Sequence, residues 1–298
     1  MPLSKDSLSN TFIVATALCL VCALVVSAAA VILKPIQLKN AQLDRKNNIL
    51  AVTGFTQQDI NTAGGIDELF EQRFDVQIID LRTGELAAEQ CQAAVEKAKD
   101  RPVPDIFAEY DQLWASKKPP NKNDPEHDLS VVLSKEEDPG GIKKREIYSR
   151  VFILKTEDGE IERYVFPVRG NGLWSLMQGY LAVEPDFQTV AGLTYYQQAE
   201  TPGLGGEVQN PQWKNKWPAK KIFDDQGNVA LKVSKGDQTD NPYGVDALSG
   251  ATITSNGVTN MIEFWMGDKG FGPYIQRQKT GGTLSNSTAS ISGVNHGQ

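Results

Sequence analysis

An uncharged segment near the N-terminus sets the first limit on how this chain can fold. Residues 11–33 (TFIVATALCLVCALVVSAAAVIL) contain no acidic or basic side chain, and as an α-helix they would span about 35 Å, enough to cross the hydrocarbon core of a bilayer. A cleaved signal peptide is the alternative, because residues 27–30 resemble a cleavage site. The apolar run is longer than a typical signal-peptide core, however, and little positive charge precedes it. We therefore expect an uncleaved transmembrane helix after a short tail at residues 1–10.

The charges that flank this helix bear on its orientation. Lys34, Lys39, Arg45 and Lys46 follow the helix, whereas only Lys5 and the amino terminus precede it. Taken alone, this distribution places the following domain in the cytoplasm, but a domain of this size can be exported despite flanking charge. The side of the membrane therefore stays open on charge alone.

Small side chains recur along one face of the same helix. Ala15, Cys19, Ala23 and Ser27 are four residues apart, and this spacing permits close approach of a neighbouring membrane helix. The pattern fits an integral-membrane partner and the ordinary composition of membrane helices equally well.

The rest of the chain has the composition of a globular domain. The whole chain of 298 residues is 40% hydrophobic, and its net charge of -7 argues against a nucleic-acid partner. There are only two histidines, His127 and His296, and two of the three cysteines lie in the membrane segment. This scarcity argues against metal sites, haem attachment and a Ser-His-Asp triad in this chain. We therefore expect any chemistry to depend on a bound cofactor.

The middle of the chain alternates strand-like runs with turn residues. The runs at 147–154 and 161–168 are separated by Thr-Glu-Asp-Gly, which is typical of a hairpin. The runs at 173–183 and 187–196 form a second predicted hairpin. Four consecutive strands predict an α+β fold built on an antiparallel sheet, with helices covering one face.

Other elements are expected on either side of these strands. They are a polar link at 34–48, a strand at 76–81, a helix at 86–100, a long loop at 116–145, a short helix opened by Asn210-Pro211 and a strand at 229–233. The soluble domain is expected to cover residues 34–275, and residues 276–298 form a tail that we expect to be disordered.

A segment rich in hydroxyl groups precedes the last predicted helix. Residues 246–257 (DALSGATITSNG) are mostly small, and Val258, Met261, Ile262 and Trp265 then recur with the spacing of one helical face. The N-terminus of a helix exposes backbone N–H groups and favours an anion such as phosphate. On this local pattern alone, an ordinary capped helix is the simpler interpretation.

Two further glycine-rich segments lie at 169–174 (RGNGLW) and 200–206 (ETPGLGG). Each alone fits a turn beside a strand. Together with residues 246–257 they would supply an apolar wall, a Glu-Thr pair for polar ring edges and a phosphate loop. Flavin mononucleotide (FMN) requires these three features.

The same segments carry a resemblance to a known family. Behind one N-terminal membrane helix, the chain resembles the C subunits (NqrC) of the bacterial Na+-translocating NADH:quinone oxidoreductases along most of its length. The segments that carry it are GNGLW at 170–174, ETPGLGGEV at 200–208, DALSGATITSNGV at 246–258 and EFWMGDKGFGPY at 263–274. The homologous G subunit of the Rnf electron-transport complex shares the anchor and the third segment, but residues 195–198 and 213–217 are more similar to the first family.

The resemblance implies a covalent cofactor. In this family a Mg2+-dependent flavin transferase uses FAD to attach FMN by a phosphoester to the last threonine of an Asp-x-x-Ser/Thr-Gly-Ala-Thr motif. That threonine corresponds to Thr252, and Thr254 is its nearest competitor. The other motif residues are Asp246, Ser249, Gly250 and Ala251. The resemblance also implies ring contacts from Leu173, Trp174, Glu200, Thr201 and Leu204.

The resemblance further implies an FMN-binding domain in the periplasm, anchored in the inner membrane. The chain would be an electron-carrying subunit of a complex that oxidises NADH, reduces ubiquinone and moves Na+. Its partners would be the other integral-membrane subunits and the flavin transferase. No G-x-G-x-x-G fingerprint follows a strand, so NADH would bind elsewhere in the complex. The alternatives are an Rnf-type G subunit and a non-redox, membrane-anchored binding module.

Overall fold

The computed structural model describes residues 8–97 and 130–281, and contacts divide the chain into two units between Asn47 and Asn48. Helix α1 (Leu8–Val52) is continuous and contains Pro35. Within the described residues, one helix, Asn10–Val52, is long and apolar enough to cross a membrane. The predicted apolar helix is thus confirmed in length and composition.

The polar link predicted at 34–48 is helical and forms part of α1. Its lysine, glutamine, leucine and arginine side chains all favour helices, so a polar composition did not mean an irregular backbone. In the second unit, the last turn of α1 buries Ile49, Leu50 and Val52.

A five-stranded antiparallel sheet forms the centre of the second unit, in the order β1-β4-β5-β6-β7. Its strands are β1 (Phe74–Asp80), β4 (Tyr148–Lys155), β5 (Ile161–Asn171), β6 (Leu176–Val183) and β7 (Val190–Gln197). Both predicted hairpins and the antiparallel α+β fold are confirmed. The strand predicted at 76–81 joins the sheet at its edge, where Phe74 lies opposite Leu154.

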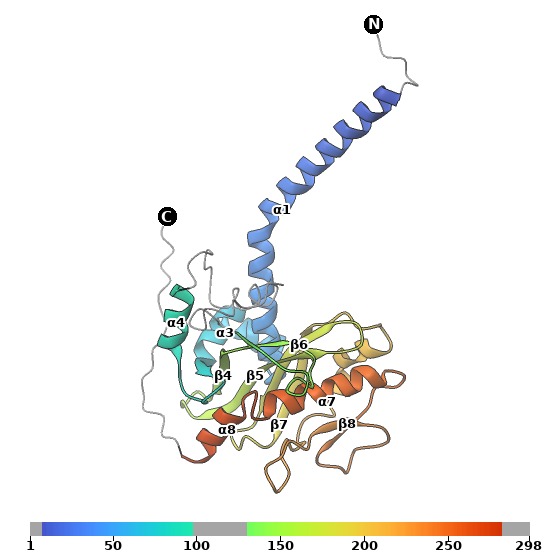
Figure 1. The fold of residues 1–298 in the computed structure, drawn as a ribbon. Helices are drawn as coiled ribbons and strands as arrows, with labels where there is room; N and C mark the ends of the chain where they lie inside the picture. The colour runs from blue at the N-terminus through green and yellow to red at the C-terminus, as the bar shows by residue number, and fades with distance from the viewer. Residues whose placement is uncertain (1–7, 98–129, 282–298) are drawn as a thin grey trace. The chain divides into compact units, whose positions relative to one another are not determined.

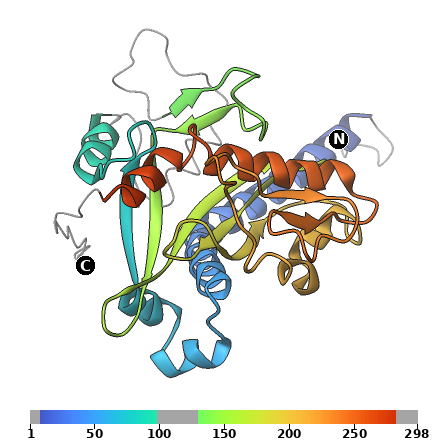
Figure 2. The same cartoon turned by 90° about the horizontal axis from the view of Figure 1, so that it is seen from below.

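Helices cover both faces of this sheet, whereas one covered face was expected (Figures 1 and 2). On one face, α7 (Thr252–Met266) and α8 (Gly272–Lys279) pack against alternate strand residues such as Phe166 and Leu181. On the other, the last turn of α1, α2 (Gln57–Ala63) and α3 (Ile66–Arg73) pack against Val165 and Tyr180. The sheet is therefore a central layer with two apolar cores.

Helix α2 was not predicted, although the sequence carries signals for both of its ends. Thr56 and Asp59 form a capping box at its start, and Gly64 adopts the left-handed conformation at its end, with φ 95°. These two ends delimit a helix of one or two turns.

The remaining elements surround the sheet. They are α4 (Ala88–Lys97), β2 (Ser130–Val132), β3 (Lys144–Glu146), the 3-10 helix η2 (Gly205–Gln209), α6 (Pro211–Lys214), β8 (Lys232–Ser234) and β9 (Gly244–Asp246). The helix within 86–100 and the helix at Asn210-Pro211 are confirmed, and Asn210 Oδ1 accepts a hydrogen bond from the Gln212 N–H at 2.9 Å. The strand predicted at 229–233 is confirmed only at residues 232 and 233, which belong to β8. Strand β8 pairs in parallel with β9.

Two segments expected to be irregular are partly regular. Within the predicted loop at 116–145, β2 and β3 form an antiparallel pair, because the apolar Val131 and Val132 favour a strand despite the charged residues that follow. Helix α8 extends over residues 276–279 of the predicted tail, anchored by the buried Tyr274 and Ile275. The first part of that loop, the end of the tail, His127 and His296 lie outside the described residues.

Candidate functional site

The segment before α7 leads to a helix start without a side-chain cap. Gly250 turns the chain with φ 71°, a left-handed conformation that favours glycine. The N-cap residue, Ala251, makes no side-chain capping bond, and Thr252, the first residue of α7, is exposed. The backbone N–H groups of the first helical turn have no acceptor inside the helix. An anion attached at Thr252 would therefore lie beside free N–H donors and the positive end of the helix dipole.

The two candidate threonines have different environments. Thr254 is 1% exposed, and its Oγ1 donates a hydrogen bond to Glu200 Oε2 at 2.7 Å. Thr252 is exposed to solvent. Of the two, Thr252 is the residue whose hydroxyl an attaching enzyme could reach.

Glu200 lies where the three glycine-rich segments meet. Its carboxylate accepts hydrogen bonds from the backbone N–H groups of Leu173 (3.0 Å), Trp174 (2.9 Å) and Ser175 (3.0 Å). It also accepts one from the Ser175 hydroxyl at 2.9 Å, besides the bond from Thr254. Burial raises the pKa of Glu200, but these hydrogen bonds outweigh it, so the pKa lies below its ordinary value. Glu200 is therefore ionised at neutral pH although it is 5% exposed.

Glycines allow these segments to approach closely. A Cβ atom at Gly172 would lie 2.6 Å from the Glu200 carboxylate, and one at Gly205 would lie 2.6 Å from Thr254 Oγ1. A Cβ atom at Gly257, inside α7, would lie 2.2 Å from the carbonyl oxygen of Asn171. These glycines therefore allow α7, the end of β5 and the segment at 200–206 to pack closely against one another.

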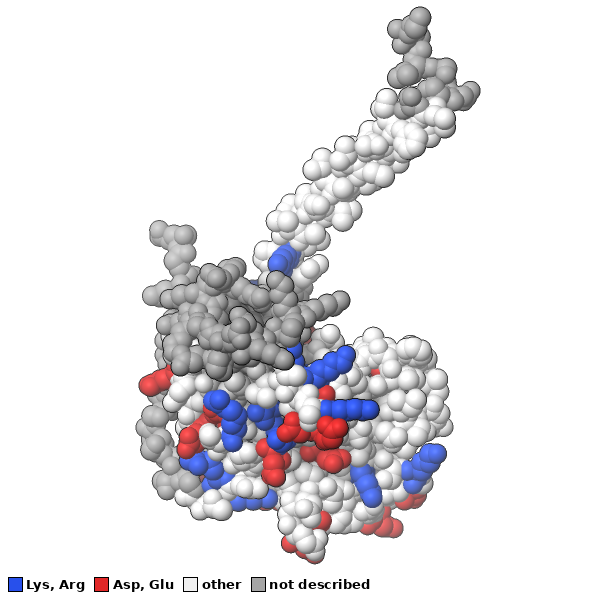
Figure 3. Space-filling view, in the orientation of Figure 1, with Lys and Arg blue, Asp and Glu red and all other residues white. Residues whose placement is uncertain are grey.

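Large apolar side chains are exposed around the start of α7. The exposed fractions are 47% for Leu173, 71% for Trp174, 42% for Leu204 and 56% for Ile253. Figure 3 shows few charged side chains on the surface over this end of α7, at the right of the view. Thr201 is also exposed, and its carbonyl oxygen accepts hydrogen bonds from the N–H groups of Leu204 and Gly206. Such an apolar surface is typical of a ligand or partner site.

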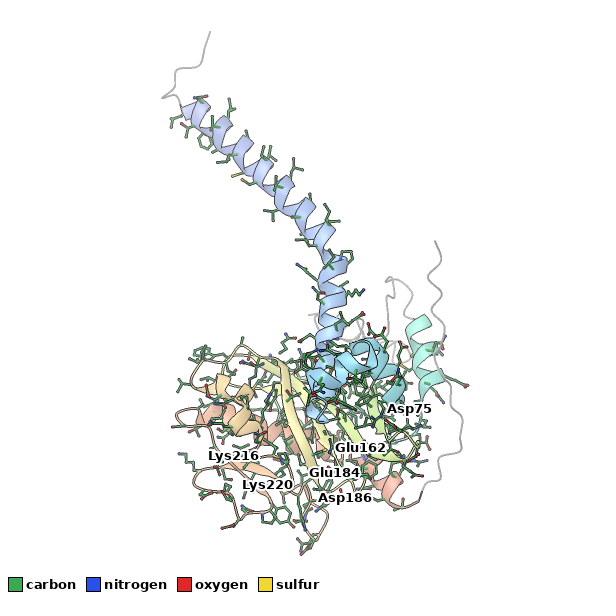
Figure 4. All side chains as sticks on the ribbon, turned by 180° about the vertical axis from the view of Figure 1, so that it is seen from behind. Asp75, Glu162, Glu184, Asp186, Lys216 and Lys220 are labelled. Carbon is green, nitrogen blue, oxygen red and sulfur yellow. The ribbon has the colours of Figure 1, made fainter. Side chains whose placement is uncertain are left out.

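Asp246, the first residue of the motif, forms hydrogen bonds with residues of two other segments, and no local sequence pattern predicts these contacts. Its carboxylate accepts hydrogen bonds from the Lys216 ammonium and, at 2.7 Å, from the Gln238 N–H, while its carbonyl oxygen accepts one from Trp213 Nε1 at 2.8 Å. The hydrogen bond from Lys216, followed by that from Gln238, holds the pKa of Asp246 below its ordinary value. Lys216 follows α6 in the chain (labelled in Figure 4).

A pH-dependent contribution to stability is expected from Asp246. Its pKa is lower in the folded than in the unfolded chain, so its interactions stabilise the fold above the unfolded value of about 4 and are lost as pH falls through the folded pKa. Since the ion pair is partly exposed, Asp246→Asn should lower the free energy of unfolding by less than about 1 kcal/mol at pH 7. Urea unfolding at pH 7, 5 and 3 should show this difference shrinking at the lowest pH. The exposed Asp225→Asn is the control, and a difference independent of pH would refute the electrostatic origin.

The structure brings the site residues predicted from the sequence to one end of α7 and its adjoining segments. Thr252, Ser249 and Gly250 are exposed, whereas Ala251 and Thr254 are buried. Leu173, Trp174 and Leu204 contribute the apolar surface, and Glu200 connects their segments to α7. Sequence reasoning missed Ile253, which is exposed one residue after Thr252. Its signal was a large apolar side chain in the first turn of an otherwise polar helix start.

Comparison with known proteins identifies the family of this chain. A model of the FMN-binding domain matches residues 172–267, which include residues 172–174 of the first site segment and all of the other two. The chain is 41% identical over 278 residues to the C subunit of the Na+-translocating NADH-quinone reductase of Neisseria meningitidis serogroup B, covering 93% of this chain and 97% of the relative. It is 42% identical over 283 residues to the corresponding protein of Vibrio anguillarum, covering 95% and 99%.

Solved structures agree with these relatives. The crystal structure of NqrC from Shewanella oneidensis matches with a TM-score of 0.63 and 31% identity, over 79% of this chain and 96% of that one. The C subunit from Parabacteroides distasonis, 24% identical with a TM-score of 0.54 over 82% and 96% of the two chains, shares the fold. The family resemblance predicted from the site segments is thus confirmed. This chain belongs to the NqrC family, the C subunits of the Na+-translocating NADH-quinone reductases.

Proposed function

We propose that this chain carries FMN as a phosphoester on Oγ1 of Thr252. In this proposal it is an electron-carrying subunit of an inner-membrane complex that oxidises NADH, reduces ubiquinone and transports Na+. The observation that carries the proposal is the contrast between the exposed Thr252 at an uncapped helix start and the buried, hydrogen-bonded Thr254. The chain would not oxidise NADH alone.

The residues around Thr252 fit the two ends of FMN. The first-turn N–H groups of α7 suit a phosphate group, and Gly250 turns the chain just before them with φ 71°. Leu173, Trp174, Leu204 and Ile253 offer an apolar surface for the flavin ring. Bound FMN would supply electron transfer, which no side chain here provides. A covalent link would keep the cofactor at high effective concentration beside its electron-transfer partners.

The surroundings of Thr252 support attachment by a separate enzyme. A threonine hydroxyl is a weak nucleophile that needs an activating base. The carboxylate of Glu200 accepts hydrogen bonds from Thr254 and the amides of 173–175, and that of Asp246 is paired with Lys216. Neither carboxylate is free to activate Thr252. We therefore assign the step to a Mg2+-dependent flavin transferase that transfers the FMN moiety of FAD to Thr252 and releases AMP.

The proposed location is the periplasmic side of the inner membrane, in keeping with the family resemblance and against the flanking charges. A C-terminal fusion to alkaline phosphatase tests it, because the disulfides of that reporter form in an oxidising compartment. We expect an active fusion. An inactive phosphatase fusion together with a fluorescent cytoplasmic reporter at the same position would place the domain in the cytoplasm.

The covalent assignment is tested with the full-length chain expressed with and without its flavin transferase. With the enzyme, the band should fluoresce under ultraviolet light after denaturing electrophoresis, and mass analysis should locate an FMN adduct on the peptide that contains Thr252. Without the enzyme, neither signal should appear. A colourless protein without adduct after co-expression would favour the non-redox binding module.

A further inference from the structure

We propose that Glu200 is a positioning residue: its buried carboxylate fixes the segment 172–175 relative to the first turn of α7, instead of contacting the flavin ring. Only the purpose of this arrangement, which is to hold the flavin surface beside Thr252, rests on the proposed function. The arrangement itself is a property of the chain without cofactor.

The hydrogen-bond capacity of Glu200 is fully used by the chain. A carboxylate offers about four lone-pair positions, and Glu200 already accepts five hydrogen bonds, from three backbone N–H groups and two hydroxyls. No acceptor position is left for a donor on a ligand. The contact between Glu200 and the ring edge that the sequence suggested is thus replaced by contacts within the protein.

The space around the carboxylate is also filled. Cβ atoms at Gly172 and Gly205 would lie 2.6 Å and 2.9 Å from its oxygens, and Glu200 is 5% exposed. Each of the five groups bonded to Glu200 acts as a donor, so both carboxylate oxygens can accept from them. A glutamine amide at this position would place its own N–H donors against the backbone N–H groups. The site therefore requires the ionised acid and not merely a side chain of its size.

The groups that Glu200 holds are those that surround Thr252. Leu173 and Trp174 are bonded through their N–H groups, which leaves their side chains exposed. Thr254 lies two residues after Thr252 in the first turn of α7, and its hydroxyl is bonded to the same carboxylate. One side chain thus connects the apolar surface to the attachment point.

The first test uses amide hydrogen exchange of the full-length chain in detergent, without FMN. In Glu200→Gln, exchange of the peptide covering residues 172–176 should accelerate about tenfold or more, because charge-assisted hydrogen bonds to three amides are lost. Peptides from β4 and β5 should keep their protection. Glu207→Gln removes a carboxylate from the same region without touching these amides and should leave exchange unchanged. Unaltered exchange in Glu200→Gln would overturn the inference.

The second test remains decisive if Glu200→Gln does not fold. Thr254→Val removes one hydroxyl but keeps the side-chain shape, and Thr254→Ser keeps the hydroxyl. In FMN-loaded chains, Thr254→Val should change the visible circular dichroism of the flavin, and Thr254→Ser should restore the wild-type spectrum. Equal spectra for all three chains would refute the link to α7. Absence of the adduct in the wild-type chain would instead reject the proposed function and leave the exchange test valid.

Discussion

Replacement of Thr252 by alanine is expected to abolish the FMN adduct while the domain still folds. The competing Thr254 is 1% exposed and hydrogen-bonded to Glu200, so it should not accept the flavin instead. Thr252 is exposed at the start of a helix, so its loss should change the free energy of unfolding by no more than about 0.5 kcal/mol. In-gel fluorescence, peptide mass and a thermal melt measure the two effects.

Thr252→Ser is the matched control for this change. It keeps a hydroxyl at the same position and should retain adduct, although a lower yield is expected because serine lacks the methyl group. An adduct that persists in Thr252→Ala would show that another residue is modified. Global unfolding of Thr252→Ala would identify a structural threonine.

The largest loss of stability is expected for Trp265→Ala, at about 3–5 kcal/mol. Trp265 is fully buried in α7 and packs against Phe271, with ring centroids 5.5 Å apart. Its Nε1 donates a hydrogen bond to the carbonyl oxygen of Arg169 at 2.7 Å, and the Arg169 guanidinium lies 4.8 Å from the ring centroid. The substitution removes this packing and this hydrogen bond. Urea unfolding of the full-length chain in detergent measures the loss.

Trp174→Ala provides the comparison within the same chain. Trp174 is 71% exposed, so its removal should change the free energy of unfolding by no more than about 0.5 kcal/mol. Similar losses for the two substitutions would contradict the assignment of Trp265 to the core and of Trp174 to a surface site.

Local patterns predicted the parts of the fold that depend on neighbours in the chain. The hairpin of β4 and β5 follows from two apolar runs around an Asp-Gly turn. The pairing of β1 with β4 joins residues far apart in the chain, such as Val76 and Phe152. No local pattern specifies that pairing, nor the second covered face of the sheet that follows from where α2 and α3 pack.

The site shows the same division. Its three segments could be recognised in the sequence because each carries its own glycines and hydroxyls. Which carboxylate bonds to which segment is decided by packing: Asp246 pairs with Lys216, in a separate segment, and Glu200 bonds to residues on both sides of it in the chain. The candidate site residues could therefore be predicted from the sequence, whereas the hydrogen bonds between them could be identified only in the structure.

The position of the last helices has a consequence for biosynthesis. Tyr274 of α8 is buried and donates a hydrogen bond to Gln77 of β1 at 3.0 Å, and Phe271 packs against Phe166 of β5. One face of the sheet is therefore incomplete until α8 has been synthesised, since these contacts join distant parts of the sequence. If FMN is attached to Thr252 as proposed, flavin transfer to a nascent chain should be inefficient compared with transfer to the finished domain.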